Sequence, residues 1–183
     1  KFMKYYFLGI GGIGMSSLAK YLFDLGYQVM GYDKTSSYIT ENLVASGIQI
    51  LFDDNIELIP SDFNKKNTQV VYTPAIPKDN PQYDYFDRQG YSIKKRAVLL
   101  GEITKDSTVF AIAGTHGKTT TASFLSHLFK YANLDFTAFL GGVLNSDKSN
   151  LVHRGTKYAI VEADEYDRSF LQLFPDYGCI TSI

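Results

Sequence analysis

Short apolar runs alternate along the chain with stretches in which apolar residues recur every three or four positions. In the first half, strands are predicted at residues 5–10, 28–32, 49–52 and 69–72. Apolar residues recur at helical spacing after the first strand until Gly26 ends that helix, and a second helix is predicted at residues 40–46. This order of strand, turn and helix predicts a parallel sheet with helices on its faces.

The same pattern restarts near residue 107. Residues 108–113 form a nearly continuous apolar run, which is typical of a strand buried on both faces of a sheet. A helix is predicted over residues 118–131, with further strands at residues 158–163 and 178–183. The inner stripe of that helix is predicted to be Ala122, Leu125, Leu128 and Ala132.

Two α/β domains follow from this pattern. We predict a Rossmann-like parallel-sheet domain over residues 1–104 and an incomplete P-loop-type α/β domain over residues 105–183. The second region holds only three or four predicted strands, which is too few for a complete doubly wound sheet. We therefore expect the chain to be part of a longer protein.

Composition narrows the class of protein. The chain has 183 residues, and 18 Lys and Arg residues against 19 Asp and Glu residues leave a formal charge of −1, which argues against binding of nucleic acid by bulk electrostatics. No apolar run approaches the roughly 18 residues of a membrane span. The single cysteine, Cys179, cannot form an internal disulfide, which fits a reducing compartment, and we expect a cytoplasmic protein. Because Cys179 lies in a predicted apolar strand, we expect it to be an inert core thiol.

The first glycine-rich segment, residues 9–14, reads Gly-Ile-Gly-Gly-Ile-Gly between a predicted strand and a predicted helix. Asp33 lies 19 residues after Gly14, at the end of the next strand, as in the dinucleotide-binding fingerprint. Without Cβ atoms the turn tightens, and a diphosphate can approach the backbone N–H groups at the helix N-terminus. The motif predicts a nucleotide diphosphate but not which nucleotide, and a tight turn that binds nothing is the alternative. The additional Gly12 leaves room for a ligand other than NAD.

The second glycine-rich segment, residues 114–120, reads Gly-Thr-His-Gly-Lys-Thr-Thr and also lies between a strand and a helix. A standard P-loop would need glycine at position 112, where Ile112 stands. The remaining parts are present, because Lys118 can reach the β- and γ-phosphates and the Thr119 hydroxyl can ligate Mg²⁺. The predicted ATP-binding residues are Gly114, Thr115, His116, Gly117, Lys118, Thr119 and Thr120.

A P-loop requires an acidic side chain near the metal, at the end of a neighbouring strand. Glu162 directly follows the apolar run at residues 158–161 and is the first candidate for the Mg²⁺ contact. Asp164 is the second candidate, and it is also a candidate N-cap for a helix at residues 168–173. Glu165 and Asp167 complete the acidic cluster.

With both loops in view, the chain resembles the Mur ligases of peptidoglycan synthesis. The resemblance rests on residues 9–16, 113–121 and 161–165, with shorter signatures at residues 79–81 and 95–97. The shortened P-loop is similar to that of the folylpolyglutamate synthetases and therefore indicates only the wider superfamily. The Gly-Gly-Ile-Gly-Met loop at residues 11–15 resembles most closely that of the alanine-adding member.

The resemblance implies three domains: a Rossmann-like domain for the UDP-sugar, a central ATPase domain and a C-terminal domain. This chain would cover the first and the front of the second. It implies that the UDP-sugar diphosphate binds at Gly11, Gly12, Ile13 and Gly14 and that Asp33 lies near the nucleotide. It also implies ATP on residues 114–120, with Lys118 and Glu162 as catalytic residues and Mg²⁺ on Thr119 and Glu162.

The implied activity is an ATP-dependent amide ligation that joins L-alanine to the carboxylate of UDP-N-acetylmuramate through an acyl phosphate. We expect both substrates to be small molecules, with no nucleic acid, membrane or obligate protein partner. We also expect the 183-residue chain alone to be inactive. The residues that select the amino acid are expected to follow Ile183.

Three alternatives and several single residues stay open at this point. A muropeptide-recycling member of the family is the nearest alternative. An NAD-dependent dehydrogenase would explain only the first loop, and a P-loop regulatory protein only the second.

Where the family usually has Ser-Ser-Ala-Ile near the uridine, this chain has Thr-Pro-Ala-Ile at residues 73–76, and Pro74 removes a backbone donor. His116 either touches phosphate or shapes the loop, and Arg96 either ends a solvated strand or lies near substrate. His127 and His153 are interpreted as structural or surface residues.

Overall fold

A computed structural model of the chain describes residues 4–144, 149–163 and 172–182. The chain forms two compact units, Lys1–Arg96 and Ala97–Ile183, which are described separately below. The division falls at the start of helix α4 (Arg96–Thr104), whereas the sequence led us to expect a boundary after residue 104.

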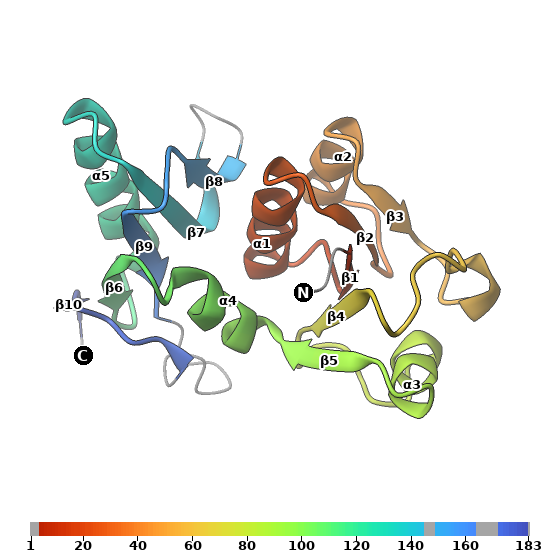
Figure 1. Cartoon of the computed structure of the whole chain (residues 1–183). Helices are drawn as coiled ribbons and strands as arrows, with labels where there is room; N and C mark the ends of the chain where they lie inside the picture. Colours follow the sequence, from red (N-terminus) through yellow and green to blue (C-terminus); the bar gives the residue numbers. More distant parts are fainter. Residues whose placement is uncertain (1–3, 145–148, 164–171, 183) are drawn as a thin grey trace. The chain divides into compact units, whose positions relative to one another are not determined.

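The first unit is built on a five-stranded parallel sheet with the strand order β3-β2-β1-β4-β5 (Figure 1). Its strands are β1 (Lys4–Leu8), β2 (Gln28–Tyr32), β3 (Gln49–Leu51), β4 (Thr68–Tyr72) and β5 (Ser92–Lys95). The chain passes from β1 outward to β3 and then returns to β4 on the other side of β1. The order therefore reverses between β1 and β4, and in open α/β sheets ligands bind at the carboxyl ends of the strands at such a point. The predicted Rossmann-like parallel sheet is confirmed.

Helices cover both faces of this sheet. They are α1 (Ile13–Asp24), α2 (Tyr38–Ala45), the short 3₁₀ helix η1 (Ile56–Leu58) and α3 (Pro81–Arg88). Helix α1 packs against α2 and against β1 and β2, and α3 lies over the opposite face (Figure 1). The Asn80 side chain accepts hydrogen bonds of 3.1 Å from the N–H groups of Gln82 and Tyr83, and Pro81 occupies the first turn. The signature at residues 79–81 thus begins a helix.

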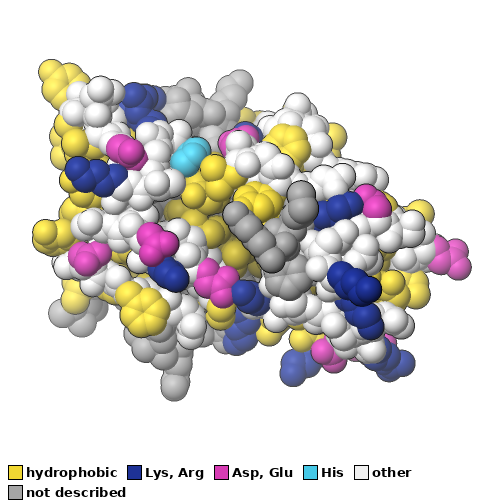
Figure 2. Space-filling model, in the orientation of Figure 1, with side chains coloured by type: hydrophobic (Ala, Val, Ile, Leu, Met, Phe, Trp, Pro, Cys, Tyr) yellow, Lys and Arg dark blue, Asp and Glu magenta, His cyan; other side chains and the backbone are white. Residues whose placement is uncertain are grey.

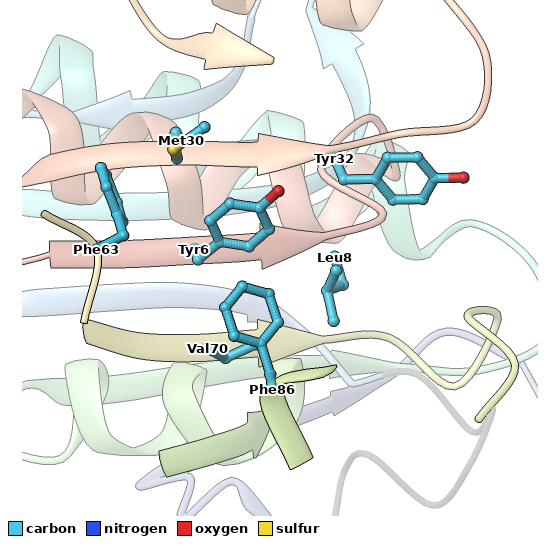
Figure 3. Close-up of a cluster of buried hydrophobic side chains, with 7 residues drawn as sticks. All are labelled: Tyr6, Leu8, Met30, Tyr32, Phe63, Val70 and Phe86. Carbon is cyan, nitrogen blue, oxygen red and sulfur yellow. The ribbon is translucent and has the colours of Figure 1, made fainter. Parts of the chain in front are cut away.

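A buried aromatic cluster joins α3 to the sheet. Figure 3 shows Phe86 of α3 facing Tyr6 of β1, and their ring centroids lie 4.8 Å apart. The Tyr6 hydroxyl donates a 2.7 Å hydrogen bond to Oε1 of Gln82, and all three side chains are fully buried. A buried hydroxyl needs such a partner, so this bond fixes α3 on β1.

We expect Tyr6→Phe to lower the free energy of unfolding of the chain by about 1–2 kcal/mol at neutral pH, because Gln82 loses its buried donor. Burial also raises the pKa of the Tyr6 phenol far above its ordinary value. Since the folded chain keeps a proton that the unfolded chain loses above about pH 10, the Tyr6 contribution is present below that pH and disappears as pH rises further. Tyr6→Phe should therefore flatten the alkaline loss of stability. Urea unfolding between pH 7 and 11 measures both effects.

The matched control for this prediction is Tyr38→Phe, because Tyr38 lies on α2 with half of its surface exposed. We expect that variant to unfold like the parent protein at every pH. Equal behaviour of the two variants would show that the Tyr6 hydroxyl contributes nothing specific.

The second unit contains a mixed sheet with the strand order β10-β6-β9-β7-β8 (Figure 1). Its elements after α4 are β6 (Thr108–Ala113), α5 (Lys118–Tyr131), β7 (Phe136–Leu144), β8 (Ser149–His153), β9 (Tyr158–Glu162) and β10 (Tyr177–Ile180). Strands β10, β6, β9 and β7 are parallel, and β8 pairs antiparallel with β7. The predicted strands at residues 108–113, 158–163 and 178–183 are confirmed as β6, β9 and a shorter β10, whereas the β7–β8 hairpin was not predicted.

The predicted inner stripe of α5 was partly wrong. Ala122 is buried and Leu125 packs against the core, but Leu128 is 60% exposed and Ala132, beyond the helix end, is also exposed. The buried face instead continues through Ser126 and Phe129. Phe129 takes the place predicted for Leu128 because its ring meets the rings of Phe110, Phe136 and Tyr158.

The prediction that Cys179 is a core thiol was also wrong. Strand β10 lies at the edge of the sheet, and Cys179 is exposed there together with the other residues of that strand. An edge strand has a neighbour on one side only, so an apolar run does not by itself guarantee burial.

The surface carries interspersed charges. Figure 2 shows Lys and Arg side chains among Asp and Glu side chains on the visible face, without a large patch of one sign. Among the described residues, no helix combines the length and the apolar character that a membrane crossing requires.

Candidate functional site

The first glycine-rich loop connects β1 to α1. Gly9 has a φ of +82°, and the N–H of Gly12 donates a 3.2 Å hydrogen bond to the Gly9 carbonyl, which closes a tight turn. Gly12 is the N-cap residue of α1, and within the described part of the chain no side chain caps this helix and its first turn holds no acidic residue. Uncapped N–H groups and the helix dipole favour an anion at this position.

Asp33 lies beside this loop and shapes it. One carboxylate oxygen, Oδ2, accepts a 2.7 Å hydrogen bond from the N–H of Gly11, and the other, Oδ1, accepts a 3.2 Å bond from the N–H of Thr35. A Cβ at Gly11 would lie 2.8 Å from Asp33 Oδ2 and 2.8 Å from Thr40 Cγ2. That Asp33 lies near the nucleotide stays a prediction from the family resemblance, and what the structure shows is that its carboxylate fixes the backbone of the loop.

The loop glycines serve different purposes. A Cβ at Gly9 would lie 3.0 Å from Thr73, in the turn after β4 that contains Pro74. A Cβ at Gly14 would lie 2.6 Å from Nη1 of Arg96, which follows β5. The Arg96 guanidinium group therefore lies beside the first turn of α1, which favours the interpretation of Arg96 as a residue near substrate.

Gly12 is different, because a Cβ there would meet only ordinary contacts, the shortest being 3.4 Å to the Gly9 carbonyl. Its φ of −63° also suits any residue. The fold therefore does not require glycine at position 12, and the absence of a side chain leaves the exposed backbone at the start of α1 open. Exposed Ile13, the first residue of α1, completes the predicted diphosphate-binding set.

We expect Gly12→Ala to change the unfolding free energy by less than about 0.5 kcal/mol and to weaken binding of a UDP-sugar by about tenfold, because the methyl group would stand where the diphosphate is predicted to bind. Gly11→Ala is the matched comparison, and it should destabilise the fold because its Cβ would collide with Asp33 and Thr40. Thermal unfolding and calorimetric titration of both variants separate the two effects. Unchanged UDP-sugar binding by Gly12→Ala would remove this loop from the site.

The second glycine-rich loop connects β6 to α5. Gly117 is the N-cap residue of α5 and has a φ of +83°, a left-handed conformation that favours glycine. The Lys118 ammonium group donates a hydrogen bond back to the Gly114 carbonyl, so this side chain lies over the loop. Thr115, His116 and Thr120 are exposed. The loop thus presents a lysine and an uncapped helix start on the same short segment.

Thr119 and Glu162 meet beside this loop, although they come from α5 and β9. The Thr119 hydroxyl donates a 2.9 Å hydrogen bond to Oε2 of Glu162, and the N–H of Gly141 donates a 2.6 Å bond to Oε1. A Cβ at Gly141 would lie 2.6 Å from the carboxylate, and a Cβ at Gly142 would lie 3.0 Å from Thr119. Strand β7 therefore forms a third side of the site, which the sequence analysis missed. The signal was the glycine pair inside a strand, which indicates a close approach.

Thr119 and Glu162 together suit Mg²⁺. A hydroxyl and a carboxylate are oxygen ligands of the kind that Mg²⁺ prefers, and Mg²⁺ usually takes few protein ligands besides phosphate and water. Across the described ranges, no group of three or more His, Cys, Asp and Glu side chains is arranged to hold a metal. Asp164, Glu165 and Asp167 lie outside the described residues, so the alternative assignments of Asp164 stay predictions.

The two remaining histidines that the sequence analysis considered, His127 and His153, lie in different surroundings. His127 lines an open groove along α5 together with Thr119, Thr120, Ser123 and Phe124. His153 ends β8, and its Nδ1 lies 2.7 Å from the Thr137 hydroxyl, which is a structural contact. Thr181 and Ser182, which follow β10, contact the second loop and had no signal in the sequence.

Comparison with known proteins identifies the family. The model described as "Mur ligase family, catalytic domain" matches residues 4–108, more than half of the chain. The chain belongs to the Mur ligase family. The resemblance to the Mur ligases that was stated from the two glycine loops is thus confirmed.

Individual members of the Mur ligase family extend the similarity over nearly the whole chain. A UDP-N-acetylmuramate–L-alanine ligase of Flavobacterium johnsoniae is 54% identical over 178 residues, which are 97% of this chain and 40% of that protein. The crystal structure of the UDP-N-acetylmuramate–alanine ligase of Thermotoga maritima is 32% identical with a TM-score of 0.89, over 98% of this chain and 41% of that one. A murein peptide ligase of Psychrobacter arcticus is 26% identical with a TM-score of 0.81, over 94% and 41%. The chain therefore spans about 40% of the length of these relatives.

Proposed function

We propose that the chain provides the UDP-sugar site and the front of the ATP site of an ATP-dependent amide ligase that joins L-alanine to UDP-N-acetylmuramate. The observation that carries this proposal is the group formed by Lys118 and Thr119 at the start of α5 and Glu162 at the end of β9. The 54% identity to an alanine-adding ligase supports alanine as the amino acid. The use of ATP favours the cytoplasm as the site of the reaction.

The chemistry begins with a carboxylate, which is a poor acyl donor. One of its oxygens attacks the γ-phosphorus of ATP, the bond to the bridging oxygen breaks, and ADP leaves an acyl phosphate. The alanine amine then attacks the acyl carbon, a C–N bond forms, the C–O bond breaks, and inorganic phosphate departs with loss of a proton from nitrogen. The first step requires in-line positioning and neutralisation of phosphate charge, which is how proteins catalyse phosphoryl transfer.

The residues of the second loop supply these two requirements. The Lys118 ammonium group provides a positive charge at the phosphates, and the N–H groups at the start of α5 can donate hydrogen bonds to phosphate oxygens. Thr119 and Glu162 would hold Mg²⁺, which when bound neutralises charge on the transferred group. Gly141 keeps the Glu162 carboxylate in place through its N–H.

The first loop would hold the substrate that carries the carboxylate. A diphosphate at the N-terminus of α1 would lie against Gly12 and near the Arg96 guanidinium group, while Asp33 keeps the loop in shape. A nicotinamide-dependent dehydrogenase would use this loop but leave Lys118, Thr119 and Glu162 without a role. Two phosphate sites in one chain therefore favour the ligase.

Isothermal titration calorimetry tests the proposal directly, and calorimetry suits a chain without tryptophan. UDP-N-acetylmuramate, ATP with Mg²⁺, and NADH are titrated separately into the 183-residue chain. We expect the first two to bind at independent sites and NADH not to bind. Binding of NADH alone would overturn the ligase proposal, and incorporation of a peptide in place of alanine by the full-length protein would identify a murein peptide ligase instead.

A further inference from the structure

Two hydroxyl side chains from a distant part of the sequence lie against the second glycine loop. Thr181 and Ser182 follow β10, which pairs in parallel with β6, so the end of β10 reaches the loop that follows β6. The N–H of Thr181 extends this pairing by donating a 2.9 Å hydrogen bond to the Ala113 carbonyl. The two side chains are thus held by the sheet rather than by a flexible loop.

Both polar groups of the His116 backbone are bonded to this pair. The Thr181 hydroxyl lies within hydrogen-bond distance of the His116 carbonyl and also of the Ala113 carbonyl, at 3.1 Å. The Ser182 hydroxyl accepts a 2.9 Å hydrogen bond from the N–H of His116 and lies 2.8 Å from the Thr115 hydroxyl. The middle of the phosphate-binding loop is therefore fixed from the side of β10.

Gly114 reflects the same contact. Its φ is +128°, and a Cβ at this position would lie 2.4 Å from the Thr181 hydroxyl and 2.8 Å from the Ser182 nitrogen. The glycine is required because the end of β10 approaches the loop so closely. This gives a physical reason for a glycine at position 114 in a loop that lacks the P-loop glycine at position 112.

We propose that Thr181 and Ser182 are positioning residues of the ATP site. By bonding the carbonyl and the N–H of His116, they set the path of the loop immediately before Gly117, where α5 begins and phosphate is bound. The N–H groups from Gly117 onward then receive the phosphates without rearrangement of the loop. This inference rests on the proposed function, because it assigns the two hydroxyl groups to the same nucleotide site.

The test compares hydroxyl-free and hydroxyl-bearing variants. Thr181→Val and Ser182→Ala are each expected to raise the Kd of the chain for Mg·ATP about threefold to tenfold, the range expected for loss of one or two hydrogen bonds. Thr181→Ser and Ser182→Thr keep a hydroxyl and should restore binding to within about twofold. The Kd for UDP-N-acetylmuramate should stay unchanged in all four variants, because that ligand binds the other unit.

Matched controls exist in the same unit. The buried Thr137 hydroxyl donates to the Gly155 carbonyl at 2.6 Å, and the Ser107 hydroxyl donates to the Thr156 carbonyl at 2.6 Å, both away from the glycine loop. We expect Thr137→Val and Ser107→Ala to lower thermal stability as much as the test variants do, without changing the Kd for ATP. If the controls weaken ATP binding equally, the role of Thr181 and Ser182 is only structural and the proposal is wrong. Tighter ATP binding by Ser182→Ala would also overturn it, because Ser182 would then compete with phosphate for the His116 N–H.

A second readout does not depend on ATP. We expect the His116 amide proton to exchange with solvent at least about threefold faster in Ser182→Ala than in the parent chain, because it loses its acceptor, and not to change in Ser107→Ala. If the parent chain does not bind ATP, the proposed function fails for this chain. The exchange measurement still tests whether Ser182 holds the His116 backbone through its hydrogen bond. Unchanged exchange in Ser182→Ala would overturn the inference even if ATP binds.

Discussion

Lys118→Met is expected to lower kcat/KM of the full-length protein for the proposed ligation about a hundredfold to a thousandfold, the usual cost of removing one charged group aimed at a transition state. The ammonium group of Lys118 already lies over the loop, bonded to the Gly114 carbonyl, so it needs little rearrangement to meet the phosphates. Methionine keeps the apolar stem of the side chain and removes the charge together with the hydrogen bond to the Gly114 carbonyl. Phosphate release by the full-length protein measures the loss, and calorimetry on this chain measures the accompanying loss of affinity for Mg·ATP.

Lys105→Met is the matched control, because Lys105 is exposed just after α4 and away from the loop. We expect that variant to bind ATP and react like the parent protein. Thermal unfolding should be the same for both variants within about 0.5 kcal/mol, since neither side chain is buried in the core. Activity of Lys118→Met within threefold of the parent would show that this lysine does not contact phosphate in the reaction.

Sequence periodicity predicted the elements that have a strong local pattern. The strands β2 and β6 and the helix α5 have the predicted bounds because each combines a clear apolar run or stripe with a glycine close to one of its ends. The helix α3 was missed because its sequence is polar and rich in tyrosine, and it buries only Gln82 and Phe86. The β7–β8 hairpin was missed because Gly141 and Gly142 interrupt the strand pattern, as expected of a position where another group approaches closely.

The candidate site likewise contains residues that a local sequence pattern indicates and residues that only the strand pairing brings to the site. Lys118 and Thr119 were predictable because their spacing from Gly117 lies within one turn of a helix. Glu162 was predictable because it ends a buried strand. The contacts of Gly141, Thr181 and Ser182 depend on which strands are neighbours, and β10 lies beside β6 although more than sixty residues separate them. No local pattern records that pairing, so these residues became visible only in the fold.

Glu162→Gln is expected to remove most of the Mg²⁺ dependence of ATP binding and to lower kcat/KM at least about a hundredfold. The two carboxylate oxygens of Glu162 both accept hydrogen bonds, from the Thr119 hydroxyl and from the N–H of Gly141. Glutamine has the same length, and its single acceptor can keep the Gly141 bond while the Thr119 hydroxyl turns to accept from the new amide. The fold of the site is therefore kept, and the charge that would face Mg²⁺ is lost.

The measurement is the affinity for ATP, determined by calorimetry at increasing concentrations of Mg²⁺. Glu57→Gln is the control, because Glu57 is exposed in the first unit. In the parent chain and in the control, affinity for ATP should rise steeply with Mg²⁺. In Glu162→Gln it should rise little, because Thr119 alone offers a neutral ligand. A parent-like Mg²⁺ response in Glu162→Gln would move the metal away from the end of β9. The acidic residues that follow Ala163 would then be the next ligands to test, and the bond from Gly141 to Glu162 would have a purely structural purpose.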